Sequence, residues 1–450
     1  MKRMLFEKVL LLSSVTLTAS DKLFLLVFAA RYGEGWSGEL RIAELAEALG
    51  LKRGLVESSV PRLIAASFLV VQPVYKKRGR PLRKLSLNKT LIGAIPVGKE
   101  FQVESILSAI SFLDRPTVRV ASLRWASGSS ATSAAKLIAS YYPLQEGDNP
   151  IARKMVDGKS TFLDASGVLL LTLLLAASDP VGVVAGWSHR RLAAAIGVTR
   201  VALKGRLKKL TDNGVLRQVI PGIGASVFSR KLSSVYIVNI NHPVFRGVCS
   251  PTAVLIFRED CDSERSKFLQ VFWEQAVYAR ESGDLRHVAH IYRHLPKHAF
   301  LQIELFVNRL VSQWLTVRLA QERDIDRLSI RESIKGFLAI LERGESAESK
   351  RAAFASESMI EELAYCAERL LEEVVLLFGT VIPATVKMNE VLMLPGNILR
   401  GYEYITLLVR AEVKSPSPVK RAPGAFGRSE CMYEQEIPQN VRLAAGLAAE

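Results

Sequence analysis

A long segment of this 450-residue chain occurs twice, and the two copies keep a constant offset. The tetrapeptide RKLS stands at 83–86 and again at 230–233, which is an offset of 147. The same offset aligns LAEALGL at 45–51 with LAAAIGV at 192–198. Three further apolar pairs share it: Val56 with Leu203, Val60 with Leu207, and Leu63 with Leu210. The chain therefore uses one structural module twice, and no other feature constrains its fold as strongly.

Both copies predict the same order of elements: an apolar helix, a short helix, a glycine turn, a second helix and two extended runs. In the first copy the turn falls at Gly50, where the backbone needs a residue that tolerates positive φ. The extended runs are expected at 68–71 and 82–87, so the first RKLS lies in the returning strand, and the second RKLS is expected to do the same. Pro61 interrupts the second helix of the first copy, so we expect that helix to kink or to end near Ser59.

The charge of the chain is concentrated in the half that carries the repeat. Lysine and arginine exceed aspartate and glutamate by 19 in residues 1–250, whereas residues 251–450 carry an excess of three acidic groups. A basic surface confined to one half is what binding to a polyanion requires.

Membrane insertion and secretion are not expected. The longest apolar run, residues 167–177, is shorter than the roughly 18–20 residues that cross a bilayer, so we interpret it as a buried helix. Glu7 and Lys8 interrupt the apolar stretch near the start, which argues against a secretory signal. The four cysteines have no CxxC spacing, which fits a reducing cytoplasm.

The segments LAEALGLKRGLVESSVPRL and LAAAIGVTRVALKGRLKKL, each followed by an expected β-hairpin, resemble the winged helix-turn-helix. The resemblance implies that the second helix of each copy enters the DNA major groove and that the hairpin, or wing, touches the backbone or the minor groove. It also implies a mainly α fold with small β-hairpin wings and two winged-helix domains. Past Pro251, apolar residues at a spacing of 3–4 predict a helical C-terminal domain.

The second copy carries the stronger candidate DNA-reading helix. Thr199 is a good N-cap. Arg200, Lys204 and Lys208 follow at i, i+4 and i+8 on the face opposite the apolar stripe, with Arg206 at its margin. Arginine can bond bidentately to guanine, and lysine is suited to phosphate. The alternative is that these are ordinary solvated surface charges.

The first copy is expected to anchor on the DNA backbone. Its helix offers Lys52 and Arg53, and its wing, KKRGRPLRK, has six basic residues in nine: Lys76, Lys77, Arg78, Arg80, Arg83 and Lys84. Arg80 beside Gly79 and Pro81 could enter a narrow minor groove. In the second wing the basic pair Arg230 and Lys231 is expected to meet phosphate.

Five regions are predicted. Residues 1–95 and 161–245 are the winged-helix domains, 96–160 a helical connector and flexible linker, 246–412 a helical assembly or effector domain, and 413–450 a disordered tail. Helices are expected at 268–278, 300–319 and 361–378. Four histidines, His287, His290, His294 and His298, lie near Asp284, but Pro296 interrupts them, so neither a metal nor another cofactor is predicted.

No phosphate loop, HExxH or GxSxG motif occurs, so an enzyme is not expected. The leading hypothesis is a sequence-specific transcription regulator that binds double-stranded DNA, forms a homo-oligomer and associates with the nucleoid in the cytoplasm of a bacterium. Its C-terminal domain would bind a protein partner or a small effector. The alternatives are a plasmid or mobile-element replication initiator that binds origin repeats, and a protein-interaction scaffold.

Overall fold

The computed structural model places part of the chain in defined positions. It describes residues 2–12, 17–74, 82–93, 101–113, 124–126, 160–162, 164–223, 232–245, 248–249, 253–260, 297–321, 327–338, 360–361, 363–372, 374–375, 387–394, 398–399, 402–412, 422–423 and 431–432. The chain divides into two compact units: residues 1–216 with 237–250, and residues 217–236 with 251–450. Helices hold 62% of the interpretable residues and the sheets are small and antiparallel, which confirms the predicted fold class at this level.

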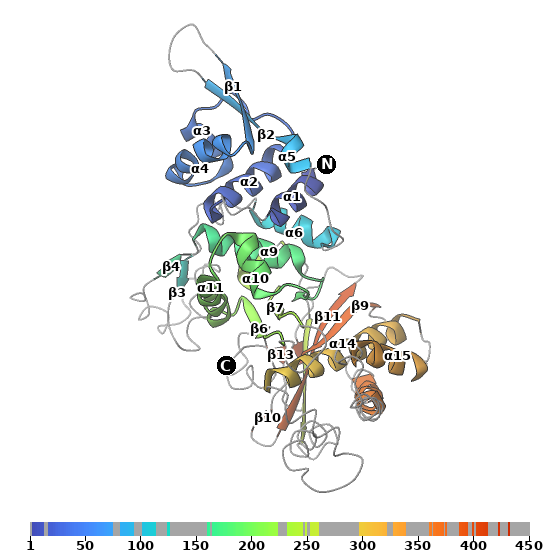
Figure 1. The fold of residues 1–450 in the computed structure, drawn as a ribbon. Coiled ribbons are helices and arrows are strands. Elements are labelled where there is room, and N and C mark those ends of the chain that lie inside the picture. Colours follow the sequence, from blue (N-terminus) through green and yellow to red (C-terminus); the bar gives the residue numbers. More distant parts are fainter. Residues whose placement is uncertain are drawn as a thin grey trace, which may run out of the picture. The chain divides into compact units, whose positions relative to one another are not determined.

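The first copy of the repeat, here called module 1 (residues 2–93), is an array of helices with one hairpin (Figure 1). Its elements are α1 (Lys2–Leu11), α2 (Ala19–Tyr32), α3 (Ile42–Leu49), α4 (Arg53–Ala65), β1 (Leu69–Val74), β2 (Leu82–Leu87) and α5 (Lys89–Gly93). Strands β1 and β2 pair antiparallel, from Leu69 opposite Leu87 to Val74 opposite Leu82. The predicted extended run at 82–87 is confirmed.

Local sequence signals set the helix ends in module 1. Thr18 caps α2 through a reciprocal pair: its Oγ1 accepts from Asp21 N at 3.3 Å, and Asp21 Oδ2 accepts from Thr18 N at 3.0 Å. Helix α3 ends at Gly50, whose φ of 61° is left-handed and whose N–H donates to the carbonyl of Ala46. The predicted glycine turn is confirmed.

Helix α4 continues through Pro61 to Ala65, so the alternative that it ends near Ser59 is wrong. Pro61 lies on the exposed side, where water can satisfy the carbonyl that the missing N–H leaves without a donor. The opposite side holds Val56, Val60 and Leu63, all fully buried. Their burial stabilises the helix across the proline.

The second copy, module 2 (residues 164–245), repeats this order. Its elements are α9 (Ala165–Ala177), β5 (Val183–Val184), α10 (His189–Ile196), α11 (Arg200–Asp212), β6 (Leu216–Ile220), β7 (Val235–Val238) and the 3-10 helix η2 (Pro243–Phe245). The three strands form a sheet in the order β5-β7-β6. Helix α9 is buried all round from Ser166 to Ala176, as the apolar run predicted. None of the helices within the described ranges is both long and apolar enough to span a membrane.

The two copies keep an offset of 147 up to the first strand of each hairpin. The second copy then has four more residues, so the offset after the hairpin is 151. Gly197 takes the place of Gly50, with a left-handed φ of 70°. After the hairpin, Asn88 and Asn239 match. Asn88 N donates to Phe68 O at 2.9 Å, and Asn239 N donates to Val215 O at 2.8 Å.

The described part of the second RKLS, Leu232 and Ser233, lies outside the named strands, so the expectation that this segment forms the returning strand is wrong for these two residues. Residues 83–86 lie inside β2, whereas β7 begins only at Val235. Leu232 makes an isolated bridge to Ile223 outside the named strands. The four extra residues of the second copy shift these two residues out of the strand that the offset assigned to them.

The two modules pack together through α2 of module 1 and α9 of module 2. Lys22 of α2 is 1% exposed, and its Nζ donates to Ala195 O at 2.8 Å and to Ala194 O at 3.0 Å. These carbonyls belong to the last turn of α10, the negative end of that helix. A further helix, α6 (Val103–Leu113), also packs on α9. In the part of the chain that connects α6 to α9, β3 (Arg124–Ala126) pairs with β4 (Ser160–Phe162).

The second unit combines helices with a four-stranded antiparallel sheet, which the prediction of a helical C-terminal domain did not include. The sheet consists of β8 (Ala253–Asp260), β9 (Lys387–Leu394), β10 (Ile398–Leu399) and β11 (Tyr402–Glu412). Strand β11 pairs with each of the other three. The predicted helix at 300–319 is confirmed as α14 (Lys297–Gln321), which α15 (Arg327–Leu338) follows. Further helical residues lie at 360–375, with 362 and 373 outside the described part, so the prediction of a helix at 361–378 is confirmed over its described residues.

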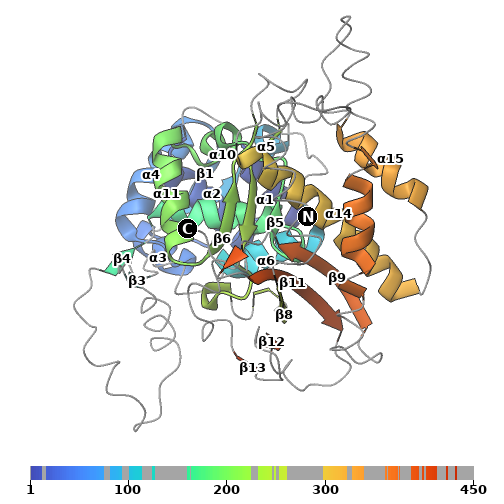
Figure 2. The same ribbon diagram turned by 90° about the horizontal axis from the view of Figure 1, so that it is seen from below.

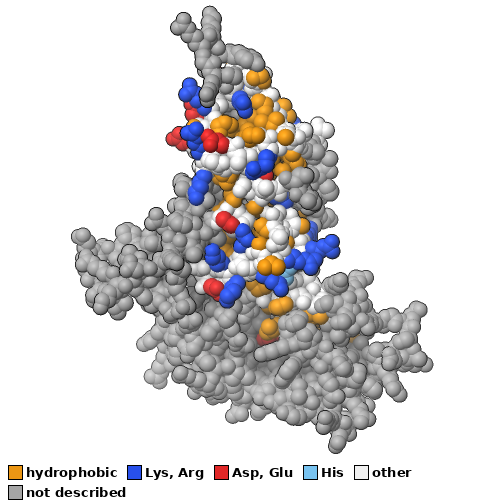
Figure 3. All heavy atoms as spheres, turned by 60° about the vertical axis from the view of Figure 1, so that its left-hand side comes forward, with side chains coloured by type: hydrophobic (Ala, Val, Ile, Leu, Met, Phe, Trp, Pro, Cys, Tyr) orange, Lys and Arg blue, Asp and Glu red, His pale blue; other side chains and the backbone are white. Residues whose placement is uncertain are grey.

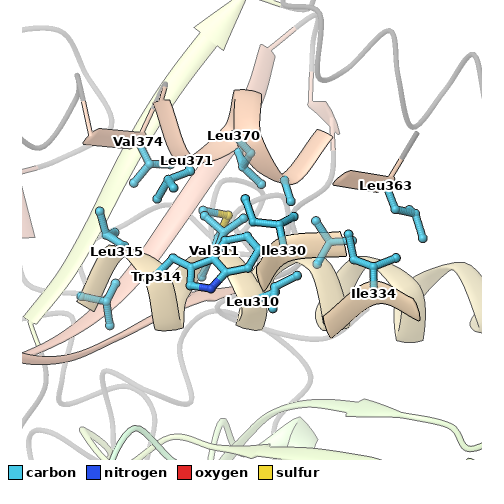
Figure 4. Packing of buried hydrophobic residues seen from close by; sticks show 14 of the residues in the cluster. Leu310, Val311, Trp314, Leu315, Ile330, Ile334, Leu363, Leu370, Leu371 and Val374 are labelled. Carbon is cyan, nitrogen blue, oxygen red and sulfur yellow. The ribbon is translucent and has the colours of Figure 1, made fainter. Parts of the chain in front are cut away.

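The core of this unit lies between α14, α15, the helical residues of 360–375 and the sheet (Figure 4). Trp314 and Leu315 of α14 and Ile334 of α15 are among its buried side chains. Viewed at 90° to Figure 1, Figure 2 shows α14 beside β9 and β11. The core includes Met393 and Leu407 from those strands.

Hydroxyl groups of α14 cover the outer edge of β9. Met393 N donates to Ser312 Oγ at 2.8 Å, and Val391 N donates to Thr316 Oγ1 at 3.2 Å. Each hydroxyl donates in turn to the carbonyl four residues earlier in the helix. The helix thus occupies edge donors that would otherwise be open to another strand.

Residues 217–236, which follow the start of β6 and lead into β7, belong to this unit. Ile223 and Leu232 pack in the same apolar cluster as α14. Gln302 Nε2 donates to Pro221 O at 2.9 Å and to Ser233 O at 3.3 Å. The described residues on either side of 224–231 therefore pack within the second unit.

Several predictions fall on residues that the structure does not describe. They are the linker segment at 127–136, the helix at 268–278, and His287, His290 and His294. Within the predicted disordered tail, β12 (Ala422–Pro423) and β13 (Cys431–Met432) form a short antiparallel pair, so disorder throughout 413–450 is wrong.

Candidate nucleic-acid interface

The candidate interface is formed by helices α4 and α11, which occupy equivalent positions in the two modules. Both lie on the left-hand side of the first unit in Figure 1, and the view from below agrees (Figure 2). Figure 3 brings that side forward and shows Lys and Arg side chains spread over it, with fewer Asp and Glu. A single surface therefore presents the second helix of both modules.

Helix α11 is held with one face inward and one face to solvent. Thr199 caps it as predicted, its Oγ1 accepting from Ala202 N at 3.2 Å. Leu203, Leu207 and Leu210 are buried, as the sequence predicted. This packing fixes the rotation of the helix and thereby sets which basic residues face outward.

Three of the predicted contact residues share the outward face of α11: Arg200, Lys204 and Lys208. Neither Arg200 nor Lys204 has a salt bridge to any residue in the described part of the chain. Lys208 Nζ lies 3.4 Å from Asp212 Oδ1, an exposed pair that contributes little and that a phosphate can replace. The stripe is open to a polyanion.

Arg206 is partly buried and paired within the module, an arrangement that favours a structural role over the predicted DNA contact. Its Nη2 lies 2.6 Å from Asp164 Oδ2, and its Nε donates to Ser166 Oγ at 2.7 Å. Burial by itself raises the pKa of Asp164, but the hydrogen bonds from Arg206, Ser166 and the Gly167 backbone outweigh it and lower that pKa below 3.8. Arg206 ties α11 to the start of α9.

Module 1 has a similar tie in a different place. Arg62 of α4 makes three hydrogen bonds to the buried carboxylate of Asp21, the shortest from Nη2 at 2.8 Å. Although burial raises the pKa of Asp21, hydrogen bonds from Arg62 and Thr18 hold it below 3.8. In both modules an aspartate holds the exposed basic helix: Asp21, in the first turn of α2, holds α4, and Asp164, at the N-cap of α9, holds α11.

The outward face of α4 is less basic than that of α11. Lys52 and Arg53 are exposed, but Arg53 Nε lies 2.7 Å from Glu57 Oε1. Glu57 stands at the position of Lys204. The exposed face of α4 therefore carries an internal ion pair where α11 has two cations without described partners.

The predicted wing residues are described only in part. Arg83 and Lys84 lie in β2, where Arg83 is exposed and Lys84 Nζ is 3.5 Å from Glu39 Oε1. The remaining predicted wing contacts, at the hairpin tips, lie outside the described residues: Lys76, Lys77, Arg78, Arg80, Arg230 and Lys231.

Two features of this surface were missed in the sequence. Arg190 and Arg191 open α10 beside α11, and the guanidinium of Arg191 stacks 4.2 Å from the ring centroid of Trp187. The HRRL segment at 189–192 was the available signal. Val201, on the outward face of α11, was also missed, although its place opposite the buried leucines follows from the helical period.

Electrostatic coupling links the two helices of module 2. Burial lowers the pKa of His189 at the start of α10, and the positive charge of Lys204 lowers it further. His189 is therefore neutral at neutral pH, and the positive charge of the surface comes from its lysine and arginine side chains. No group of three or more potential metal ligands occurs within the described residues.

Comparison of the chain with family models, with curated protein sequences and with solved structures finds no match.

Proposed function

We propose that the two modules are winged helix-turn-helix domains and that the chain is a sequence-specific double-stranded DNA-binding protein that regulates transcription. The observation that carries the proposal is the outward stripe of α11, where Arg200, Lys204 and Lys208 lie opposite a fully buried leucine stripe. A helix exposed in this way can enter a major groove, with arginine reading guanine and lysine contacting phosphate.

The tandem arrangement supports recognition of one continuous site. Lys22 and the packing of α2 on α9 hold the two modules in one unit, so α4 and α11 move together. In this proposal α11 supplies most of the base contacts and α4 with the first wing supplies backbone contacts.

The proposal is tested by selecting duplexes from fragmented source DNA and sequencing those that bind. We expect wild-type protein to enrich a discrete site and a triple variant, Arg200→Ala with Lys204→Ala and Lys208→Ala, to lose that enrichment. The matched control removes the same positive charge elsewhere, through Lys89→Ala, Arg331→Ala and Lys335→Ala, and should keep it.

Equal binding of all fragments would contradict sequence-specific reading and reduce the interface to phosphate attraction. Absence of binding at low salt would overturn the DNA-binding proposal and favour a protein-interaction scaffold. The location of enriched sites separates regulation from replication initiation: promoter sites support the proposal, whereas tandem repeats beside an AT-rich origin support an initiator.

A further inference from the structure

Val201 is an apolar side chain that folding of the chain does not explain. It lies in the first turn of α11 and is 81% exposed, more than any other large hydrophobic residue among those described. A β-branched residue loses rotamer freedom in a helix, and an exposed one gains no burial in return. Its presence on this face therefore has a cost that a partner surface would offset.

Gly205 lies one turn further along the same face, and internal packing does not require it either. A Cβ added at this position would meet nothing within 4 Å. Glycine inside a helix is less favourable than alanine by about 1 kcal/mol. Both positions thus reduce the stability of α11 without a compensating contact within the described chain.

The neighbours of these two residues indicate the kind of surface that covers them. Arg200 precedes Val201, while Lys204 and Lys208 flank Gly205 on the exposed face. Such a rim of cations fits a polyanion. On the floor of the DNA major groove, the apolar group that a base presents is the C5 methyl of thymine.

We propose that Val201 is a specificity-determining residue that contacts a thymine methyl in the major groove, and that Gly205 allows α11 to approach closely enough for this contact. The inference rests on the proposed DNA-binding function and adds to it one element of the target, a thymine at a fixed position under the first turn of α11. Arg200 next to Val201 would contact a neighbouring base or phosphate.

Module 1 is expected to lack this contact. Gly54 stands at the position of Val201 and Ser58 at that of Gly205. Neither offers an apolar group to a methyl, and a Cβ at Gly54 also meets nothing within 4 Å. Reading of a thymine methyl by a recognition helix would therefore be a property of the second module, which agrees with its more basic outward face.

The test replaces each thymine of a selected site, one at a time, by deoxyuridine, which lacks only the methyl. We expect one thymine at which this change weakens binding of the wild-type protein about fourfold, the factor for one buried methyl group. Val201→Ala should weaken binding to the unmodified site by a similar factor and should no longer distinguish thymine from deoxyuridine there.

Gly205→Ala supplies a readout that a purely structural role would not give. Alanine should raise the melting temperature of the protein, because it favours the helix, while lowering DNA affinity, because its methyl holds the helix away from the groove. If Gly205 served only the folding of α11, the melting temperature and the DNA affinity of Gly205→Ala would change in the same direction. Val201→Ala should not lower the melting temperature, since the valine side chain packs little within the chain.

Three results would overturn the inference. Specific binding without any methyl-sensitive thymine would remove it and leave the proposed function intact. Equal sensitivity to deoxyuridine in wild type and Val201→Ala would assign the contact to another residue. Lack of binding to every duplex would remove the proposed function and this inference together.

Discussion

Arg206 and Asp164 form a 2.6 Å ion pair that joins the middle of α11 to the N-cap of α9. Through this pair Arg206 helps to hold the module together. Lys204, two residues earlier on the same helix, is exposed to solvent. Charge counting along α11 treats the two cations alike, but the geometry assigns them opposite roles.

Replacing Arg206 should therefore affect stability and leave binding unchanged. Arg206→Met is expected to lower the free energy of unfolding by about 1 kcal/mol, since the pair is partly solvated and Ser166 loses one partner. Lys204→Met, the matched variant, should leave stability unchanged and weaken DNA binding. Thermal denaturation and titration with DNA measure both quantities. Loss of DNA affinity in folded Arg206→Met would contradict this division of roles.

Exchanging the charges at the equivalent positions 57 and 204 tests the asymmetry between the modules. Lys204→Glu should reduce the affinity for DNA. The negative slope of log K against log salt should become shallower by about 1, which is the contribution of one phosphate contact. Glu57→Lys removes the acceptor of Arg53, so it should raise the affinity for DNA and make the negative slope steeper. Salt titrations of the two variants and of the double exchange measure the effect. Equal slopes in all proteins would show that neither helix meets phosphate at these positions.

The local part of this fold could be predicted from the sequence. The leucine stripe of α11, the threonine cap and the glycine turn depend on residues within a turn of one another, so periodicity reveals them. Arg206 could have been recognised too, because it lies three residues after Leu203 and four before Leu210, at the edge of the buried stripe. Its partner Asp164, 42 residues earlier, could not.

Other features depend on distant parts of the chain and left no local pattern. The sheet of the second unit pairs Ala253–Asp260 with Tyr402–Glu412, and a short apolar run does not distinguish such a strand from a buried helix. The identity of the two RKLS segments concealed the four extra residues of the second hairpin. The correct alignment of the two copies after the hairpin is shown by matching hydrogen bonds: Asn88 Nδ2 donates to Ser67 O, and Asn239 Nδ2 donates to Gly214 O.

Lys22 makes the stability of the first unit depend on pH in the alkaline range. Burial lowers its pKa from 10.5 to about 8. Between these values the unfolded chain binds more protons than the folded one, so stability should rise with pH through this window relative to a variant without the lysine. Below pH 8 the lysine is charged in both states and the cost of burying its charge is fully present.

The measurement compares the pH dependence of unfolding for wild type and Lys22→Met. The difference in unfolding free energy between them should change across pH 8 to 10.5 and stay constant below it. Lys22→Met also leaves the carbonyls of Ala194 and Ala195 without this donor, which should loosen the contact between the modules. Lys89→Met, at an exposed lysine, serves as the control. Parallel curves for wild type and Lys22→Met would show that Lys22 titrates as it does in water.

The hydrogen bonds between α14 and β9 depend on a match between the repeat of the helix and the repeat of the strand. Four helical residues rise about 6 Å and two strand residues about 6.7 Å, so Ser312 and Thr316 meet Met393 and Val391 in step. Ser312→Ala should lower the free energy of unfolding by about 1–3 kcal/mol, since it leaves the buried N–H of Met393 without an acceptor. Ser333→Ala, whose hydroxyl bonds only within α15, should cost less. Denaturant unfolding of both variants decides the point, and an equal loss would mean that the hydroxyls do not hold the sheet edge.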